Sequence, residues 1–170
     1  TEAVAKRIAE QVGADSSKIV RVNRRLAYGF THMLKSRFEV AFKRRPGIFP
    51  FKWDPRDYDL IFVGTPVWYN SYNPVFNTLF EVIKIYDRKV ALFSTGETES
   101  EKALDKFSEK LKDSVILGRF HCVEPIFEDD EAETEKILAQ AAEWAQGIAD
   151  QAEKMIEQEE FERRKTIYKF

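Results

Sequence analysis

The residues best suited to chemistry lie in two short polar segments, each directly after a run of apolar residues. The first segment contains three aromatic residues within a stretch of five, and the second consists mainly of hydroxyl-bearing residues and a glycine. Aromatic faces stack on flat conjugated rings, while hydroxyls and backbone amides can bond the edge of such a ring. The segments are Gly64-Thr65-Pro66-Val67-Trp68-Tyr69-Asn70-Ser71-Tyr72-Asn73-Pro74 and Ser94-Thr95-Gly96-Glu97-Thr98.

The three aromatic residues of the first segment, Trp68, Tyr69 and Tyr72, allow two interpretations. They either close the top of the hydrophobic core, or they form a platform for a flat ring. Their spacing alone does not decide between the two.

Other reactive residue types are sparse. The single cysteine, Cys122, cannot form an internal disulfide, and its place in an apolar run favours an inert buried thiol. The two histidines, His32 and His121, are isolated and no CxxC pair occurs, which excludes a Cys/His zinc site. No acid–base pair or nucleophile stands out, so we predict neither catalytic residues nor a metal site.

Length and composition indicate a folded domain with a well-solvated surface. The chain has 170 residues, of which 44% are hydrophobic and 33% charged. Single domains cluster near about 100–150 residues, so one domain with an appendage is expected. No apolar run approaches the roughly 18 residues of a spanning helix, and no secretory signal opens the sequence. We therefore expect a cytoplasmic protein with no membrane partner.

The charges are distributed unevenly along the chain. Residues 1–56 contain 13 Lys/Arg and 5 Asp/Glu, whereas residues 57–170 contain 14 and 24. A basic region can bind nucleic acid, but these cations are scattered and the aromatic residues among them sit in apolar surroundings. We therefore predict no nucleic-acid binding.

Short apolar runs predict the strands of a sheet. Runs without polar alternation are typical of parallel strands that are covered on both faces. The predicted strands are Lys18–Val22, Leu60–Val63, Lys89–Phe93, and a last, bent strand made from Val115–Leu117 and Phe120–Val123.

Apolar residues at helical spacing predict helices between these runs. Thr1 is available as the cap of the first helix and Gly13 as its stop, and Pro74 suits the first turn of another. Further helices are predicted from Ala103 to Leu111 and from about Glu131 into a charged tail.

Residues 23–57 form a long excursion between two predicted strands. Apolar residues from Phe30 to Phe42 suit a helix, which Pro46-Gly47 and Pro50 would end. The stretch is too apolar for a disordered linker, so we expect it to pack on the domain.

Strands that alternate with helices predict a parallel sheet covered on both faces, which is an α/β fold. Ligands of such a sheet bind beyond the carboxyl ends of its strands. Both polar segments lie there, because each follows a predicted buried strand.

Several stretches of the chain, taken in order, resemble the flavodoxin family. The resemblance covers roughly residues 1–150 and is most specific at Gly64-Thr65-Pro66-Val67-Trp68. It implies a five-stranded, doubly wound, three-layer α/β/α sheet, followed by a C-terminal helical extension and tail over residues 151–170. The similar stretches are Thr1–Ala5 (start of the family's first helix), Asp57–Trp68 with Asn73–Leu79 (third strand, flavin loop and next helix), Lys89–Gly96 (fourth strand and loop) and Leu117–Cys122 (final strand).

The resemblance implies non-covalent binding of flavin mononucleotide (FMN). Thr65 and Trp68 would line the flavin ring, and Thr1 would match the last threonine of the family's phosphate loop. The full set of implied cofactor-binding residues is Thr1, Thr65, Pro66, Val67, Trp68, Tyr69, Asn70, Ser94, Thr95, Gly96 and Glu97.

One departure from the family concerns its first strand and most of its phosphate loop, which should precede Thr1 and are not in this sequence. In the strand order 2-1-3-4-5 that strand would lie between those holding Val20 and Ile61. Its absence would leave strand edges unpaired in a buried place. Either the sequence is a fragment, or another segment or chain fills this position; Lys165–Phe170 is a weak candidate.

A second departure is that the segment Ser94–Thr98 contains no aromatic residue. The usual outer stacking partner of the flavin must then come from elsewhere. Tyr69, Tyr72 and the region Tyr28–Phe30 are the candidates.

The expected function is electron transfer by an FMN-binding protein to a redox protein partner, with a homodimer left open. The cofactor would carry the redox chemistry, while the protein supplies placement and electrostatics. Two alternatives are an FMN-dependent NAD(P)H:quinone-type reductase on the same fold, and a non-catalytic interaction protein that has lost FMN. Flavodoxins are typically acidic, so the basic stretch Arg21–Arg56 is expected to be a partner surface.

Overall fold

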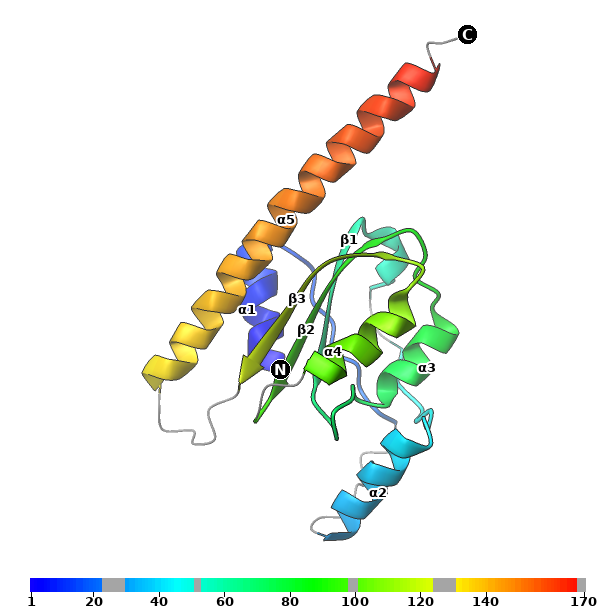
Figure 1. Cartoon of the computed structure of the whole chain (residues 1–170), viewed down its shortest axis with the longest axis vertical. Coiled ribbons are helices and arrows are strands. Elements are labelled where there is room, and N and C mark those ends of the chain that lie inside the picture. The colour runs from blue at the N-terminus through cyan, green and yellow to red at the C-terminus, as the bar shows by residue number, and fades with distance from the viewer. Residues whose placement is uncertain (23–29, 51–52, 98–100, 124–130, 168–170) are drawn as a thin grey trace.

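Three parallel strands form the sheet in the computed structural model, which describes residues 1–22, 30–50, 53–97, 101–123 and 131–167 (Figure 1). They lie in the order β1 (Leu60–Pro66), β2 (Lys89–Gly96) and β3 (Val115–Val123). β1 and β2 pair without interruption from Leu60–Lys89 to Pro66–Thr95. The carboxyl ends of the strands, where both polar segments begin, therefore share one edge of the sheet.

Helices cover both faces of this sheet and make it the middle of three layers (Figure 1). One face packs against α1 (Glu2–Val12) and α5 (Glu131–Ile167), the other against α3 (Val75–Val82) and α4 (Glu101–Ser108). Short 3-10 turns lie at Pro55–Asp57 and Glu109–Leu111. The predicted parallel α/β fold and the long C-terminal helix are confirmed.

The central strand, β2, supplies both hydrophobic clusters. Val90 and Leu92 belong to the cluster on the α3/α4 side, and Phe93 belongs to the cluster on the α1/α5 side. Successive side chains of a strand point to opposite faces, so a strand buried on both faces is apolar along most of its length. For this reason the apolar runs Leu60–Val63 and Lys89–Phe93 indicate buried strands.

The strand predicted at Lys18–Val22 is wrong. Within the described residues, this segment forms one isolated antiparallel bridge, between Arg21 and Ile48. Two hydrogen bonds flank the bridge, from Val22 N to Gly47 O (2.9 Å) and from Phe49 N to Val20 O (2.8 Å). The backbone of this apolar run therefore pairs with residues 47–49. To be a strand of the sheet, it would have to pair with another strand of the sheet instead.

The bend predicted in the last strand is confirmed as a β-bulge. The register between β2 and β3 shifts between Val90 and Ala91, because Val90 pairs with Ile116 and Ala91 with Gly118. A Cβ at Gly118 would come within 2.5 Å of Ile148 Cδ1 on α5. Glycine therefore lets α5 pack closely against the strand at this point.

The C-terminal tail is helical rather than extended, so Lys165–Phe170 as a strand candidate is wrong for residues 165–167; residues 168–170 lie outside the described part. Ion pairs one turn apart, Arg164–Glu160 (3.5 Å) and Lys165–Glu162 (3.0 Å), accompany the helix. α5 runs without a break through Asp150 and Gln151. The division into residues 1–150 and 151–170 stays a prediction.

The helix predicted between Phe30 and Phe42 is confirmed as α2 (Phe30–Ala41), and the stretch contacts the domain as expected, but α2 does so without burying its large apolar residues 33, 34 and 38. Met33, Leu34 and Phe38 are about half exposed (51, 45 and 52%), whereas Ser36 and Glu39 are buried. The helix faces the domain with its polar side because polar contacts attach it there.

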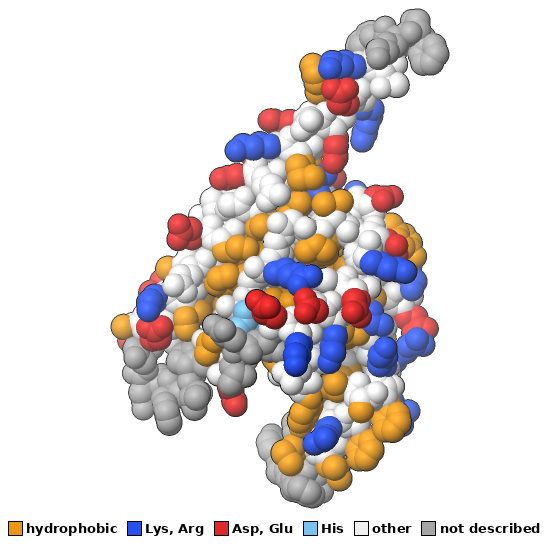
Figure 2. All heavy atoms as spheres, viewed as in Figure 1, with side chains coloured by type: hydrophobic (Ala, Val, Ile, Leu, Met, Phe, Trp, Pro, Cys, Tyr) orange, Lys and Arg blue, Asp and Glu red, His pale blue; other side chains and the backbone are white. Residues whose placement is uncertain are grey.

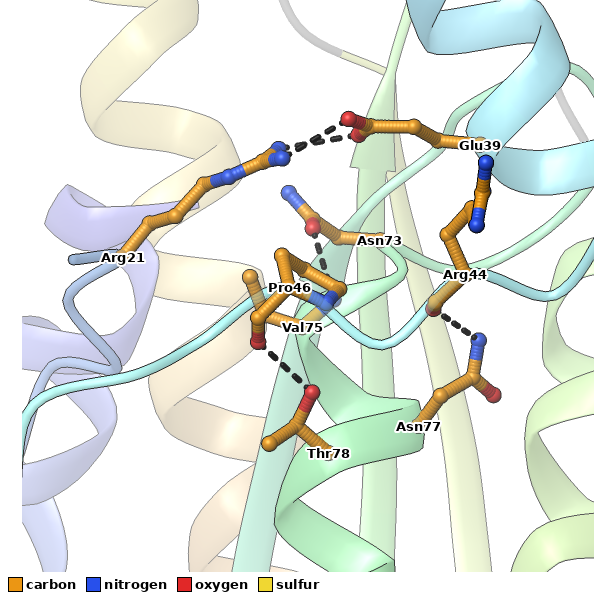
Figure 3. A network of polar contacts seen from close by, with 8 residues as sticks. All are labelled: Arg21, Glu39, Arg44, Pro46, Asn73, Val75, Asn77 and Thr78. Carbon is orange, nitrogen blue, oxygen red and sulfur yellow. Dashed lines mark hydrogen bonds and ion pairs between the residues drawn. The ribbon is translucent and has the colours of Figure 1, made fainter. Parts of the chain in front are cut away.

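Figure 3 shows these polar contacts. Arg21 on the loop after α1 binds Glu39 of α2 through two hydrogen bonds of 2.9 and 2.7 Å. Two α3 side chains bind backbone carbonyls of the segment after α2: Thr78 Oγ1 donates to Pro46 O (2.6 Å), and Asn77 Nδ2 to Arg44 O (3.1 Å). Residues 21–48 are thereby tied to the first turns of α3.

None of the helices in the described ranges is both long and apolar enough to cross a membrane.

Candidate functional site

The loop between β1 and α3 is held by the hydroxyl of Thr65. This side chain is fully buried, accepts a hydrogen bond from the backbone N–H of Asn73 (2.9 Å) and donates one to Pro66 O (3.0 Å). Asn73 Oδ1 in turn accepts from Val75 N (3.1 Å), satisfying a free amide at the start of α3. The Thr65 side chain therefore shapes the loop, and its hydroxyl is already used within the protein.

The tip of this loop has an unusual backbone. Tyr69 and Asn70 both have positive φ angles (51° and 54°), a left-handed conformation that is uncommon for residues other than glycine. Trp68 N donates to Ser71 O (2.7 Å), and Asn70 O accepts from Lys106 Nζ on α4 (2.9 Å). These contacts fix the turn, which leaves Trp68 half-buried and Tyr69 exposed at the edge of the sheet.

Tyr69 also joins the loop to α2. Its hydroxyl donates to Met33 O (2.9 Å) and lies 3.2 Å from Ser36 Oγ. α2 is thus a direct neighbour of the loop tip.

The aromatic platform does not extend to Tyr72, which is a core residue. Only 6% of it is exposed, its ring stacks on Phe107 with centroids 5.2 Å apart, and its hydroxyl donates to Asn77 Oδ1 (2.8 Å). Burial raises the pKa of the Tyr72 phenol to about 12. Of the candidates for an outer stacking partner, Tyr72 is therefore excluded by its position. Tyr28, Gly29 and the side chain of Phe30 lie outside the described residues.

The second polar segment meets the start of α1. Thr95 is buried, and its Oγ1 forms a short hydrogen bond with Thr1 Oγ1, across 94 positions of sequence. Thr1 is the N-cap residue of α1 as predicted, but its side chain forms no capping bond to the helix. The contact therefore brings together two residues that the resemblance implies as cofactor-binding, and the Thr1 hydroxyl bonds across to Thr95 rather than capping the helix.

Ser94 and His121 form a polar pair that the sequence analysis missed. Ser94 Oγ lies 2.7 Å from His121 Nδ1, and Ser94 is fully buried while His121 is half-buried. Sheet register explains the contact, because Ser94 and His121 are direct partners across β2 and β3. The sequence contains a signal for this pair, because both residues stand near the carboxyl ends of consecutive predicted strands. Cys122, the next residue, is buried as predicted.

Gly96 lies where the two loops run close together. A Cβ there would lie 3.1 Å from the Cβ of Val67 and 3.8 Å from His121 Cε1. Val67 N also donates to Thr95 O (2.8 Å), which extends the pairing of β1 and β2. Glu97 follows as an exposed residue at the end of the described segment.

A cavity of about 770 Å³ lies beside β1. Its walls are largely apolar and come from β1, α1 and α3, and from residues 14–19. Of the predicted site residues, Thr1 and Pro66 line this cavity. Thr95 contacts Thr1, and Val67 N donates to Thr95 O, so both loops reach the residues that border the cavity.

The residues of this region fit a flavin nucleotide. Orphan amides and the dipole of a helix N-terminus favour a phosphate, and Thr1 stands at the N-terminus of α1. Tyr69, at the left-handed turn, is an exposed aromatic residue, and the glycine at position 96 allows the second loop to lie close to the first. Within the described ranges, no cluster of three His, Cys, Asp or Glu side chains could hold a metal ion.

Comparison with known proteins gives a family match over most of the chain. The sequence model of the family described as Flavodoxin matches residues 1–120. A search of curated protein sequences finds no significant match.

Solved structures share the fold at low sequence identity. A structure assigned as a flavoprotein from Bacteroides eggerthii has a TM-score of 0.68 and 19% identity, with 88% of this chain and 90% of that chain covered. One so assigned from Bacteroides uniformis gives 0.65 and 18%, with 86 and 90% covered. A flavoprotein from Lactobacillus acidophilus, crystallised in complex with FMN, gives 0.57 and 20%, with 78 and 89% covered.

Proposed function

The chain belongs to the flavodoxin family, and on this premise we propose that it binds FMN at the carboxyl edge of its sheet and transfers electrons to a redox protein partner. The similarity to a flavoprotein crystallised with FMN supports the choice of cofactor. In an open parallel sheet this edge is also the usual place for a ligand.

The single observation that carries the proposal is the meeting of Thr1 and Thr95. Their hydroxyls contact each other although one belongs to the start of α1 and the other to the end of β2. A helix N-terminus, a hydroxyl pair and two close loops converge there, and this combination suits a ligand with a phosphate and a polar ring edge.

In this proposal different residues of the region bind the two ends of the cofactor. Thr1 and Thr95 would bind the phosphate end, and Trp68 and Tyr69 would contact the ring, with Pro66, Val67 and Asn70 beside it. Ser94, Gly96 and Glu97 would flank the ring on the other side, with His121 fixing the orientation of Ser94 through the 2.7 Å contact. Bound FMN supplies the redox chemistry, and these residues bind it, orient it and limit its contact with water.

The test is a titration of the purified protein with FMN and, separately, with riboflavin, followed by flavin fluorescence and calorimetry. We expect FMN to bind more tightly than riboflavin, because riboflavin lacks the phosphate. Failure to bind either flavin would overturn the proposal and favour a non-catalytic interaction protein. Rapid NADPH oxidation with a quinone by the FMN-loaded protein would favour a reductase over an electron carrier.

Two variants locate the site within the protein. Trp68→Ala removes a stacking surface worth about 1 kcal/mol, so FMN should bind roughly fivefold more weakly and its absorption spectrum should shift. Thr95→Val keeps the shape of the side chain but removes the hydroxyl, and should weaken FMN more than riboflavin. Tyr86→Ala is the matched control, because Tyr86 is an exposed aromatic residue before the amino end of β2. If Tyr86→Ala and Trp68→Ala behave alike, the ring does not lie at Trp68.

A further inference from the structure

α2 exposes large apolar side chains and buries polar ones, the reverse of an ordinary surface helix. A surface helix usually buries an apolar stripe and exposes its polar face. Here the buried positions are Ser36 and Glu39, while Met33, Leu34 and Phe38 are exposed and Phe42, just after the helix, is 69% exposed. Phe38 and Phe42 stack on each other, with ring centroids 5.8 Å apart, outside the core of the protein. Such a cluster on a monomer marks an interaction surface.

The exposed charges on the same segment are all positive. Residues 33–45 carry five exposed cations, and their one carboxylate, Glu39, is buried against Arg21. Arg45 pairs with Glu81, but Lys35, Arg37, Lys43 and Arg44 form no ion pair with any described residue. Figure 2 shows hydrophobic and basic side chains together over α2. We call this exposed side of residues 33–45 the α2 surface; it suits a partner that is both acidic and apolar.

The far part of α5 has that complementary character. Residues 150–162, here called the α5 end, contain six carboxylates and one cation, all of them exposed. Glu159 pairs with Lys89 of β2, and Glu162 pairs with Lys165. By helical periodicity Asp150, Glu153, Glu157 and Glu160 share one face with Phe161, which is 57% exposed. Glu153 and Glu157 form no ion pair with any residue in the described part of the chain, whereas Glu160 pairs with Arg164 of the next turn.

The two surfaces lie at opposite ends of the molecule, so they cannot meet within one chain (Figure 1). Two copies placed antiparallel, however, would bring the α5 end of each copy to the α2 surface of the other. We propose that this chain forms a reciprocal dimer in which Phe161 and the acidic face of each α5 end dock on the α2 surface of the second copy. The contact is isologous, because the same two surfaces are used twice around one two-fold axis.

Charge decides between this arrangement and a contact of α2 with α2. Two α2 surfaces face to face would bring ten cations together and leave both α5 ends without a partner. The reciprocal arrangement instead places opposite charges against each other, which favours encounter and fixes the partner. The reciprocal arrangement also brings the second copy beside Tyr69, whose hydroxyl donates a hydrogen bond to Met33 O of α2.

The experiment is sedimentation equilibrium of the full chain at low ionic strength and at about 0.5 M salt, where exposed charges are largely screened. We expect a dimer whose dissociation constant rises at least about tenfold at high salt. Reversing two charges on the α2 surface, Arg37→Glu with Lys43→Glu, should give a monomer, and so should Glu153→Lys with Glu157→Lys on the α5 end. Lys102→Glu with Lys110→Glu, on exposed positions of α4 and the turn after it, is the control with the same change of charge and should stay dimeric.

Mixing the two monomeric variants is the decisive measurement. In a reciprocal dimer both interfaces of the mixed pair again join opposite charges, so the mixture should dimerise although neither component does. A wild-type chain that is monomeric at low salt overturns the proposal, as does a dimer that survives both reversals. Binding to phosphatidylserine vesicles that depends on Arg37 and Lys43, with the chain monomeric, would overturn it in favour of a lipid surface.

Discussion

α2 and α3 are neighbours around the loop between β1 and α3, yet they use their apolar side chains in opposite ways. α3 buries Val75, Phe76, Leu79 and Phe80 against the sheet. α2 leaves Met33, Leu34 and Phe38 about half exposed and contacts the domain through the pair Arg21–Glu39. Apolar content therefore does not distinguish a core helix from an interaction helix; the contacts of the opposite face do.

The difference also separates two kinds of stability. The phenylalanines of α3 pack with Phe107 of α4, with the rings of Phe76 and Phe107 4.7 Å apart at an angle of 67°. Their burial contributes to the unfolding free energy of the whole domain. The attachment of α2 depends on directional polar contacts, which contribute little each but fail sharply when one partner is removed.

The largest effect is expected from Phe76→Ala. Phe76 is 4% exposed and touches two other rings, so its removal leaves a cavity and should lower the unfolding free energy by about 3–5 kcal/mol. Chemical denaturation followed by far-UV circular dichroism measures this. A loss below about 1 kcal/mol would mean that α3 is no more a core helix than α2.

A smaller loss is expected from Glu39→Gln, which leaves the Arg21 guanidinium without its carboxylate. The Arg21 side chain is only 18% exposed and its Nε has no hydrogen-bond partner among the described residues, so a cost of about 1–3 kcal/mol is expected. The loss should be confined to α2, as faster amide hydrogen exchange in residues 33–41 with little change in α3. Arg21→Met with Glu39→Met should recover part of the loss, because neither partner is then left unpaired.

The same ion pair predicts a dependence on pH. The hydrogen bond from Arg21 holds the pKa of the Glu39 carboxyl below its ordinary value, although burial opposes this. A lowered pKa in the folded state contributes stability that is present above the unfolded pKa, about 4.3, and is lost as the pH falls through the folded value. Attachment of α2 should therefore hold at neutral pH and weaken below about pH 4.

Denaturation curves of the wild type and Glu39→Gln across this range isolate the contribution of Glu39. The stability difference between them should shrink as the pH falls, since the wild-type carboxyl is then protonated as well. A difference that stays constant down to pH 3 would show that the charge of Glu39 is not what attaches α2.

The smallest effect on stability is expected from Phe38→Ala. Phe38 is 52% exposed and contacts the similarly exposed Phe42, so the unfolding free energy of the monomer should change by no more than about 0.5 kcal/mol. Phe76→Ala makes the same chemical change at a buried position, so the difference between the two losses of unfolding free energy measures the effect of burial. A loss above about 2 kcal/mol would place Phe38 in a core and remove the contrast between the two helices.

Local patterns were enough to predict most elements of the fold. The runs Leu60–Val63 and Lys89–Phe93, the bend before Phe120, and the helices that begin near Pro74 and Glu131 all appear as predicted. These succeed because strand and helix periods are properties of neighbouring residues. The run Lys18–Val22 failed because a strand also requires a partner, and in the described part of the chain its partner is the segment 47–49.

The candidate site was predictable in position but not in the role of each side chain. The rule that ligands bind at the carboxyl edge of a parallel sheet located both loops from sequence alone. It could not tell that Tyr72 turns into the core while Tyr69 turns toward α2, since both lie in the same short loop. The pair Ser94–His121 and the contact of Thr1 with Thr95 depend on strand register and helix placement, which join distant residues.

By itself, the sequence determined the α/β class, the buried strands, the long last helix and the two loops that carry polar and aromatic groups. Only the tertiary structure decided which face of α2 is outward, and therefore that its apolar and basic side chains are exposed. The physical reason is that periodicity defines the faces of an element, whereas burial depends on what packs against each face. For α2 the nearest partners were Arg21 and Tyr69, so its polar side turned inward.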